Sequence, residues 1–398
     1  MTTIPRVFVR PRAARPFFAR HPWVFATSIE KLEGDPPPGG EVDVMTHDGV
    51  FIARGLYNPS SGIRVRLYRW EREPIDEAFL RERLRIAVDL RVRVLGLGGR
   101  GRATRLVFSE GDGLSGLTVD RFDRGLVAQF SGLGLYLRKE TILDALLAIV
   151  PDVDSITIKG DRSTAEAEGL TVEEGLARGR VSEGETIIEE NGVRYSLDLG
   201  GGQKTGFYID QRENRRVVAG FARNRDVLDL YCYSGGFGLN AAMHGGAKSI
   251  LGVDSSGPAI ELARRNAKIN GVEIAEYVED DVSGRIRILA ETGRTFGLVV
   301  CDPPKFVRHP KHLEKGLKTY LRLNRSAIDL VEPGGILATC SCSGAVDREL
   351  FAQVLAQASE LARRPIRILE IRGQAADHPV SAACLESEYL ECVICAVE

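Results

Sequence analysis

The feature that most constrains the fold is an alternation of strand-like and helix-like segments from about Gly192 to Glu398. Repeated β-α units form a parallel sheet with helices on both faces. Ligands of such sheets bind outside the carboxyl ends of the strands. The expected strands are 226–230, 249–253, 296–301 and 335–340, with a last strand at 390–397 at the edge or in an antiparallel pair. The expected helices are 211–221, 257–270, 318–330 and 345–362.

The preceding half of the chain has a different pattern. Short β-like runs separated by Gly, Pro, Asn and Asp predict a small β-rich domain from Thr2 to about Arg72. A helical stretch, several strands and a second helix then predict a central α+β domain over residues 76–190. With the α/β domain at 191–398, the 398 residues form three domains.

Composition excludes several classes of protein. The chain has no apolar run long enough to span a membrane and no apolar secretory leader, so we expect a cytoplasmic protein. Seven cysteines, all in the second half, are typical of reduced thiols rather than of a disulfide framework. The net charge is −2, yet the first twenty residues carry five arginines and no acid. This basic end suits a polyanionic partner, and a solvated set of arginines is the equal alternative.

A glycine-rich turn is expected to bind a cofactor. Gly235, Gly236 and Gly238 follow the first strand of the α/β domain and open a helix, where they allow close approach of a ligand. The turn alone would equally serve a dinucleotide or a purely structural role. The next residues narrow the choice, because acids come at the ends of four successive strands. These acids are Asp229, Asp254, Asp281 and Asp302.

Such a row of carboxylates suits a nucleoside cofactor, with Asp254 at the ribose and Asp281 at the adenine amino group. Each aspartate alone is as easily a helix cap or a solvated loop residue. Asp302 also precedes two prolines, which fix an extended turn that a dinucleotide enzyme does not need. Asp210 with Glu213 is expected to be the N-cap of a helix with its capping partner. The loop before Asp210, with Lys204, Thr205, Phe207 and Tyr208, is expected to reach over the cofactor. Further expected cofactor contacts are Tyr208, Gln211, Arg212, Tyr231, Ser234, Gly235, Ser255, Val282 and Pro303.

A candidate nucleophile follows the fifth strand. Carbon 5 of a pyrimidine is weakly nucleophilic, and a thiolate that adds at carbon 6 activates it. Cys340 and Cys342 lie on one face by the two-residue period of a strand, and Cys342 is nearer the carboxyl end. We therefore assign the nucleophile to Cys342 and the holding of the base to Asp302. Cys340 remains the alternative, and an inert buried cysteine is the plain reading for any single thiol.

Metal binding is not expected. Cys392 and Cys395 have the spacing of a zinc knuckle, but they lie in an apolar strand-like run where the two thiols should not converge. The loop after Asp302 is instead basic and suits phosphate groups beside the site. The residues expected to contact a nucleic-acid substrate are Lys204, Lys305, Phe306 and Arg308.

Eight segments together resemble the bacterial large-subunit ribosomal RNA methyltransferase I family, nearly from end to end. They are His21–Phe25, Ala53–Tyr57, Gly113–Phe122, Lys204–Arg212, Tyr233–Phe237, Asp302–Val307, Ser341–Gly344 and Gln374–Val380. The resemblance implies a PUA domain over residues 1–75, which is an RNA-binding β-barrel, and a central α+β domain over residues 76–190. It implies a Rossmann-like class I methyltransferase domain over residues 191–398. It implies transfer of a methyl group from S-adenosylmethionine to C5 of a cytosine in large-subunit ribosomal RNA. It places the catalytic cysteine at Cys342 and the cofactor-binding acids at the four aspartates above.

One departure weakens the cytosine assignment. Many RNA cytosine methyltransferases carry a second cysteine after the Asp-Pro of the fourth strand, which helps to release the product. This chain has Pro304 and Lys305 there, so release needs another base or water. N-methylation of a purine by the same fold, which needs no cysteine, stays open as an alternative. So do a non-catalytic RNA-binding assembly factor and, more distantly, a dinucleotide oxidoreductase. The target nucleotide and the oligomeric state, a homodimer included, are not determined by the sequence.

Overall fold

A computed structural model describes residues 4–160, 166–180, 185–197, 207–307 and 309–398. The described residues divide into two compact units. Unit 1 holds those up to Thr186 together with Ala376–Ser387, and unit 2 holds the others. Residues 376–387, part of the expected third domain, thus cluster with unit 1. Among the described residues, no helix combines the length and the apolar character that crossing a bilayer requires.

The first part of unit 1 is a six-stranded sheet in the order β2-β6-β5-β4-β1-β3. Its core is made by alternate inward residues such as Val7, Val42 and Val65, together with Phe17 of the short helix α1 (Arg15–Phe18). This alternation of apolar and polar residues is what a sheet with one solvated face requires. The strands are β1 (Arg6–Val9), β2 (Trp23–Phe25), β3 (Ile29–Glu33), β4 (Glu41–Met45), β5 (Phe51–Tyr57) and β6 (Ile63–Arg69).

The second part of unit 1 is a five-stranded sheet in the order β11-β10-β9-β8-β7, with helices packed on it. The strands are β7 (Ala103–Phe108), β8 (Leu117–Phe122), β9 (Gly125–Phe130), β10 (Ser155–Lys159) and β11 (Gly175–Gly179). The helices are α2 (Glu77–Asp89), α3 (Leu133–Tyr136) and α4 (Lys139–Ile149). Helix α2 begins where Asp76 accepts a hydrogen bond from the amide of Phe79, an N-cap.

The segment 376–387 is held in unit 1 by buried polar contacts. The fully buried guanidinium of Arg91 donates to the carbonyl of Asp377 at 2.7 Å and pairs with the carboxylate of Asp112 at 2.5 Å. The carboxylate of Asp377 accepts the amide of Arg105 at 3.0 Å. Buried charges persist where they are paired and hydrogen-bonded. The conspicuous Gln374–Val380 segment therefore has a structural role.

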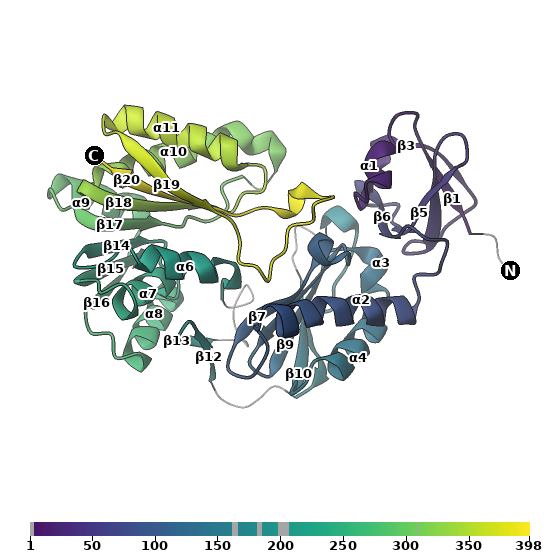
Figure 1. Cartoon of the computed structure of the whole chain (residues 1–398), viewed down its shortest axis with the longest axis horizontal. Helices are drawn as coiled ribbons and strands as arrows, with labels where there is room; N and C mark the ends of the chain where they lie inside the picture. Colours follow the sequence, from purple (N-terminus) through teal and green to yellow (C-terminus); the bar gives the residue numbers. More distant parts are fainter. Residues whose placement is uncertain (1–3, 161–165, 181–184, 198–206, 308) are drawn as a thin grey trace. The chain divides into compact units, whose positions relative to one another are not determined.

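Unit 2 is a seven-stranded sheet in the order β16-β15-β14-β17-β18-β20-β19, with helices on both faces (Figure 1). The first five strands are parallel, and β20 pairs antiparallel with both β18 and β19. The strands are β14 (Asp226–Leu230), β15 (Ser249–Asp254), β16 (Ala275–Glu279), β17 (Phe296–Cys301), β18 (Val331–Ser341), β19 (Ile366–Arg372) and β20 (Glu391–Val397). A hairpin of β12 (Thr186–Glu190) and β13 (Val193–Leu197) precedes them.

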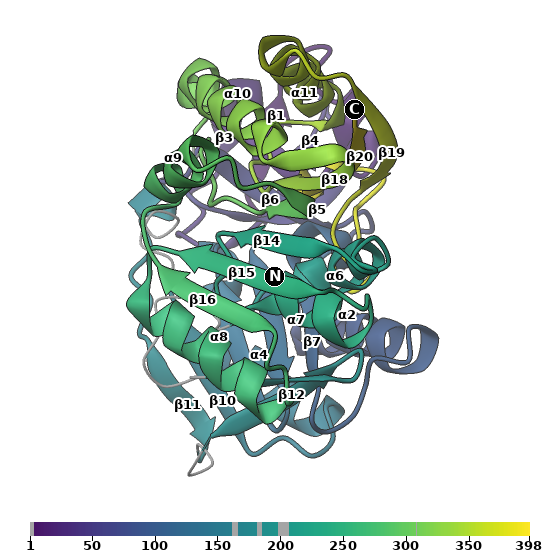
Figure 2. The same ribbon diagram turned by 90° about the vertical axis from the view of Figure 1, so that its left-hand side faces the viewer.

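The Rossmann-like arrangement expected for this half is confirmed, because the buried strands alternate between two apolar layers. Val227 and Leu298 face the layer of α6 (Arg212–Ala219) and α7 (Gly236–Met243), while Leu228 and Val299 face the other layer. That second layer is formed by α9 (Val282–Glu291), α10 (Leu313–Asp329) and α11 (Arg348–Ala362). Helix α8 (Gly257–Ile269) contacts β16 and β15, and Figure 2 shows it beside β16.

The last strand is antiparallel, one of the two expected alternatives, but it is not at the edge. The edge is β19, a strand that the sequence pattern did not indicate. The sequence of β19 is Ile-Arg-Ile-Leu-Glu-Ile-Arg, and all seven residues are exposed or half-buried. The strand therefore lacks the continuous buried apolar run that is typical of a central strand.

Candidate active site

Three of the expected aspartates and Cys342 lie at the carboxyl ends of adjacent strands in unit 2. Asp229 is the penultimate residue of β14 and Asp254 the last of β15, while Asp302 follows β17 and Cys342 follows β18. The chain moves outward from β14 to β16 and then returns to β17 on the other side of β14. A crevice forms at such a reversal of strand order. The structure thus brings these four residues to the same end of the sheet, where the parallel strands have their carboxyl ends.

The glycine-rich turn between β14 and α7 has an unusual backbone. Tyr231, Tyr233 and Gly235 have φ of 60°, 46° and 80°, the left-handed region that costs a tyrosine of order 1 kcal/mol. A Cβ on Gly235 would lie 2.6 Å from the hydroxyl of Tyr277, so no other residue fits there. The carboxylate of Asp254 accepts the amide of Tyr233 at 3.0 Å and holds the turn in place.

The two carboxylate oxygens of Asp229 differ in their hydrogen bonding. Its Oδ2 accepts the amide of Gly238 at 2.9 Å, while the buried Oδ1 has no hydrogen-bond partner in the described part of the chain. Burial raises the pKa of Asp229 to about 7, although the amide of Gly238 opposes the shift. A buried acceptor of this kind fits a cationic donor. The ammonium group of the methionine part of S-adenosylmethionine is such a donor, so this residue fits that cofactor.

Asp281 lies two residues beyond β16. It is the N-cap of α9, where its Oδ2 accepts the amide of Gly284 at 2.7 Å. Asp281 therefore caps a helix, which was the structural alternative to cofactor binding, and its contact with the adenine of the cofactor remains a proposal. Ser255 and Val282 adjoin Asp254 and Asp281 at the same ends of the strands.

The loop after β17 is tied to the loop after β18. The hydroxyl of Ser343 accepts the amide of Val307 at 3.2 Å and lies 3.0 Å from the hydroxyl of Tyr320. The Sγ of Cys342 lies 3.9 Å from the carbonyl oxygen of Pro303. Asp302, Pro303 and Cys342 are consequently neighbours. Cys342 is also half-buried, whereas the other six cysteines are all buried.

The alternative nucleophile, Cys340, is fully buried in β18 and lies opposite Cys392 in the register of β18 and β20. Contact with Cys392, and then burial, raise the pKa of Cys340 well above its usual value. Its surroundings disfavour the thiolate. Cys392 and Cys395 lie in two different apolar clusters, so these two thiols of β20 do not converge, as expected from the strand-like run in which they lie.

Asp302 has a strongly perturbed acidity. Burial raises its pKa to about 7, the negative charge of Asp210 adds to the shift, and Arg215 and Gln211 oppose it. The side-chain amide of Gln211 donates to Oδ2 of Asp302 at 3.1 Å. A carboxyl group with this pKa is partly protonated near neutrality and can donate a hydrogen bond.

The segment before α6 is held by a buried ion pair. Arg215 binds Glu190 through two hydrogen bonds of 2.7 and 2.9 Å, and it also donates to the carbonyl of Tyr208 at 2.7 Å. Arg212 is buried with its Nε 3.9 Å from the same carboxylate. The ring of Tyr208 meets that of Tyr233 edge-on at 5.3 Å. Tyr208 is thus placed beside the glycine-rich turn.

Two polar contacts at the site were not expected from the sequence. The hydroxyl of Tyr389 donates to Oδ2 of Asp210 at 2.5 Å, and the amide of Ala375 donates to its carbonyl at 2.8 Å. Asp210 was expected to cap the following helix, which is wrong, because a short turn (Ile209–Gln211) intervenes and Gln211 occupies the N-cap position. Tyr389 lies 179 residues away in sequence, and no local pattern links the two.

Of the residues expected to contact nucleic acid, Lys305 is exposed and Phe306 packs edge-on against Tyr320 at 4.8 Å. Lys204 and Arg308 lie outside the described residues.

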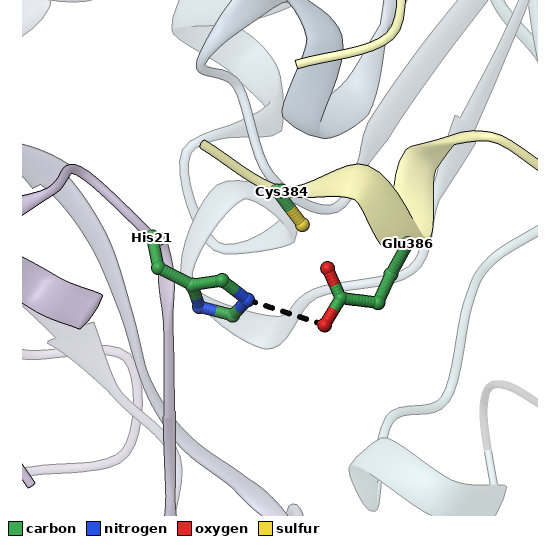
Figure 3. A group of neighbouring side chains, drawn as sticks. All are labelled: His21, Cys384 and Glu386. Carbon is green, nitrogen blue, oxygen red and sulfur yellow. Dashed lines mark hydrogen bonds and ion pairs between the residues drawn. The ribbon is translucent and has the colours of Figure 1, made fainter. Parts of the chain in front are cut away.

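One group of possible metal ligands occurs among the described residues, in unit 1, where His21, Cys384 and Glu386 converge (Figure 3). Nδ1 of His21 accepts the amide of Trp23 at 3.3 Å, and its Nε2 lies 3.4 Å from the carboxylate of Glu386. A neutral imidazole with Nδ1 as acceptor carries its proton on Nε2. That nitrogen then donates to Glu386 and has no lone pair for a metal. We interpret the group as a hydrogen-bonded His–Glu pair.

Comparisons with known proteins agree with this geometry. Residues 176–369 match a family of S-adenosylmethionine-dependent methyltransferases, and residues 7–70 match a family of PUA-like domains. The chain is 38% identical over 382 residues to ribosomal RNA large subunit methyltransferase I of Vibrio parahaemolyticus, covering 95% of this chain and 96% of that one. The corresponding protein of Vibrio campbellii gives the same identity and coverage.

Solved structures share the fold at low sequence identity. One is a protein of Streptococcus mutans described as an S-adenosylmethionine-dependent methyltransferase, with a TM-score of 0.85 and 18% identity, covering 99% of this chain and all of that chain. Another, SMU.776, was solved as a complex with SAH and has a TM-score of 0.86 at 19% identity, with the same coverage. The family matches confirm the PUA-like domain expected at the start of the chain and S-adenosylmethionine as the cofactor.

Proposed function

Because the chain belongs to the ribosomal RNA large subunit methyltransferase I family, we propose that it methylates carbon 5 of a cytosine in large-subunit ribosomal RNA. Methylation of that RNA follows from the family. The position on the base is our inference, and one observation carries it. Of the seven cysteines, Cys342 alone is not buried, and it adjoins the Asp302 loop at the carboxyl end of the sheet. N-methylation of a purine would have no use for a thiol there.

S-adenosylmethionine supplies an electrophilic methyl group when it is bound. The residues that would hold it are those around the glycine-rich turn, with Asp229 at the ammonium group and Asp254 at the ribose. Tyr231, Ser234, Ser255 and Val282 adjoin these positions and are proposed as further contacts. Asp281 is proposed at the adenine. Because Gly235 has no side chain, a ligand can approach the backbone of the turn at the carboxyl ends of the strands.

Cys342 and Asp302 would act on the cytosine. The Cys342 thiolate forms a bond from Sγ to carbon 6, the electrons of the 5,6 double bond move into the ring, and Asp302 donates its proton to N3. Carbon 5 is then nucleophilic and would form a bond to the methyl carbon while the bond from that carbon to sulfur breaks, which leaves S-adenosylhomocysteine. Loss of the proton from carbon 5 to a base or water, with cleavage of the Sγ–C6 bond and return of the N3 proton, restores the aromatic ring. The base has to leave its stack to reach these groups.

The product identifies the reaction. We expect in vitro transcribed, unmodified large-subunit rRNA to gain 5-methylcytidine at one position when incubated with the full chain and S-adenosylmethionine, as measured by nucleoside mass spectrometry with mapping. An N-methylated purine would overturn the cytosine assignment. Binding of the RNA without binding of the cofactor would instead indicate a non-catalytic assembly factor.

The affinity for S-adenosylmethionine should depend on pH through Asp229. Its pKa of about 7 is above the ordinary value, so the free protein carries a proton there below pH 7 that the cofactor's ammonium group displaces. The Kd measured by calorimetry should fall up to about tenfold per pH unit as the pH rises toward 7, and level off above.

Replacement of the aspartate tests that assignment. In Asp229→Asn the pH dependence should disappear and binding should weaken by about 10- to 100-fold, the loss of a charged hydrogen bond. Asp226→Asn is the matched control, because Asp226 begins the same strand and bonds Ser249 at the opposite edge of the sheet. An Asp229→Asn variant with unchanged affinity and pH dependence would remove this residue from the cofactor site.

A further inference from the structure

A chain of hydrogen bonds leads from β19 to Asp302. Nε of Arg372 lies 3.1 Å from Oδ1 of Asn214, Nδ2 of Asn214 lies 2.7 Å from Oε1 of Gln211, and Nε2 of Gln211 lies 3.1 Å from Oδ2 of Asp302. The side chains of Asn214 and Gln211 are buried, at 1% and 2% exposure. Residues far apart in sequence therefore meet at the carboxyl group of Asp302.

The direction of this chain is fixed chemically at its start. An arginine guanidinium only donates, so the Asn214 atom that faces Arg372 is the oxygen. The carbonyl of Gly373 only accepts, and it lies 3.1 Å from the other Asn214 atom, which is then the nitrogen. Two independent partners thus orient the Asn214 amide. Its NH₂ group donates to Gln211, so the Gln211 oxygen faces Asn214 and the Gln211 nitrogen faces Asp302.

The consequence lies at the two oxygens of Asp302. Oδ2 accepts a hydrogen bond from Gln211 and is disfavoured as the site of the carboxyl proton, which leaves Oδ1. We propose that Gln211 is a positioning residue that keeps the proton of Asp302 on Oδ1. From Oδ1, Asp302 donates that proton to N3 of cytosine, and this inference rests on the proposed cytosine chemistry. Gln211 was expected to contact the cofactor, and that contact stays a prediction. In the structure the two ends of its amide bond Asn214 and Asp302.

This arrangement also selects the base. N3 of cytosine is a hydrogen-bond acceptor, while N3 of uracil carries a hydrogen and is a donor. A carboxyl group with its proton on Oδ1 pairs with cytosine and repels the N3–H of uracil. Selection should therefore follow the protonation of Asp302. The titratable or charged groups that act on it are Asp210, Arg215, Asp229, Tyr208, Cys301 and Cys340.

The test compares Gln211→Met with Gln353→Met, a matched change at an exposed position of α11. Single-turnover methylation of the unmodified large-subunit rRNA transcript is measured from pH 6 to 9, beside a transcript with uridine at the mapped target. Gln211→Met should lower the rate by about 10- to 100-fold, the effect of one hydrogen bond to a charged group. The falling alkaline limb should move up by about one pH unit, because a donor to the carboxylate is lost. The preference for cytidine over uridine should shrink.

A second variant leaves Gln211 in place. Asn214→Asp keeps the acceptor for Arg372 but cannot donate to Gln211, so the Gln211 amide is free to turn. It should shift the alkaline limb and the base preference in the same sense, by less. Unchanged pH profiles and base preference in both variants would overturn the proposal. So would a loss in Gln211→Met confined to the Kd of S-adenosylmethionine, which would return Gln211 to the cofactor.

Failure of the proposed function would look different. If the proposed function is wrong, the wild-type protein forms no 5-methylcytidine, and this is seen before any variant is compared. Gln353→Met should match the wild type in every measurement, and thermal unfolding of each variant checks that it is folded.

Discussion

Replacing Cys342 with alanine is expected to reduce methyl transfer by at least about 10⁴-fold, because removal of a covalent nucleophile removes the pathway rather than one contact. Cys342→Ser should be nearly as slow, since a hydroxyl is a far poorer nucleophile than a thiolate toward carbon 6. Binding of S-adenosylmethionine should be unchanged in both, because the proposed cofactor contacts lie around the glycine-rich turn. The measurement is single-turnover transfer of a labelled methyl group to the unmodified rRNA transcript.

A trapped adduct makes this prediction specific to the mechanism. RNA transcribed with 5-fluorocytidine keeps fluorine at carbon 5, where a proton has to leave, so the Cys342–C6 bond should persist and retard the protein on a denaturing gel. Cys342→Ala should give no such band. Cys395→Ala is the matched control. Cys395 is a buried cysteine opposite Leu337 in the register of β18 and β20, before the carboxyl end of β18, and its loss should cost stability but not the adduct. Full activity of Cys342→Ala would contradict the C5 mechanism and favour methylation of a purine nitrogen.

The sequence predicted the positions of the four aspartates because one rule applies to them all. In a parallel sheet the carboxyl ends of the strands meet at one edge, so residues that end successive strands become neighbours without any knowledge of packing. Asp254 ends its strand, and Asp229 is the last residue but one of its strand. Asp302 follows its strand directly, and Asp281 lies two residues beyond its strand. Cys342 was preferred over Cys340 for the same reason, and it is the cysteine that remains partly exposed.

The contacts that tune the site could not be predicted in this way. Asn214 meets Arg372 across 158 residues, and Asp210 meets Tyr389 across 179. Such pairs depend on β19 and on the residues just before β20. The sequence pattern gave no sign of β19, an edge strand with little buried surface. Local reasoning instead assigned Asp210 to a helix cap, the commonest use of an aspartate before a helix.

The second large effect is expected at Asp302. Asp302→Asn should slow methyl transfer by about 10²- to 10⁴-fold, the range for loss of a general acid. Asparagine can still accept from Gln211 through its oxygen and present its NH₂ group to N3, so binding of the RNA should be largely kept. It cannot transfer a proton, however, so the step that activates carbon 5 should fail. Rates and RNA affinities measured on the same transcript separate the two effects.

The pH dependence gives the prediction its sign. With a pKa of about 7, Asp302 holds its proton below pH 7 and loses it above, so the wild-type rate should fall on the alkaline side of pH 7. In Asp302→Asn that fall should vanish, leaving a slow rate that does not decline above pH 7. A variant that keeps the same alkaline limb would show that another group supplies the proton.

Asp302→Asn should raise the stability of the protein above pH 7 although it lowers the rate of methyl transfer. The pKa of Asp302 is higher in the folded chain than the ordinary value, so the folded state binds more protons than the unfolded state between about pH 4 and pH 7. Stability from this group therefore falls as the pH rises through that window, and the full cost is present above pH 7. Asp302→Asn removes a buried charge, so its Tm at pH 8 should exceed that of the wild type, with little difference at pH 4. An equal or lower Tm at pH 8 would mean that the ionised carboxylate is better stabilised than its burial and the neighbouring Asp210 imply.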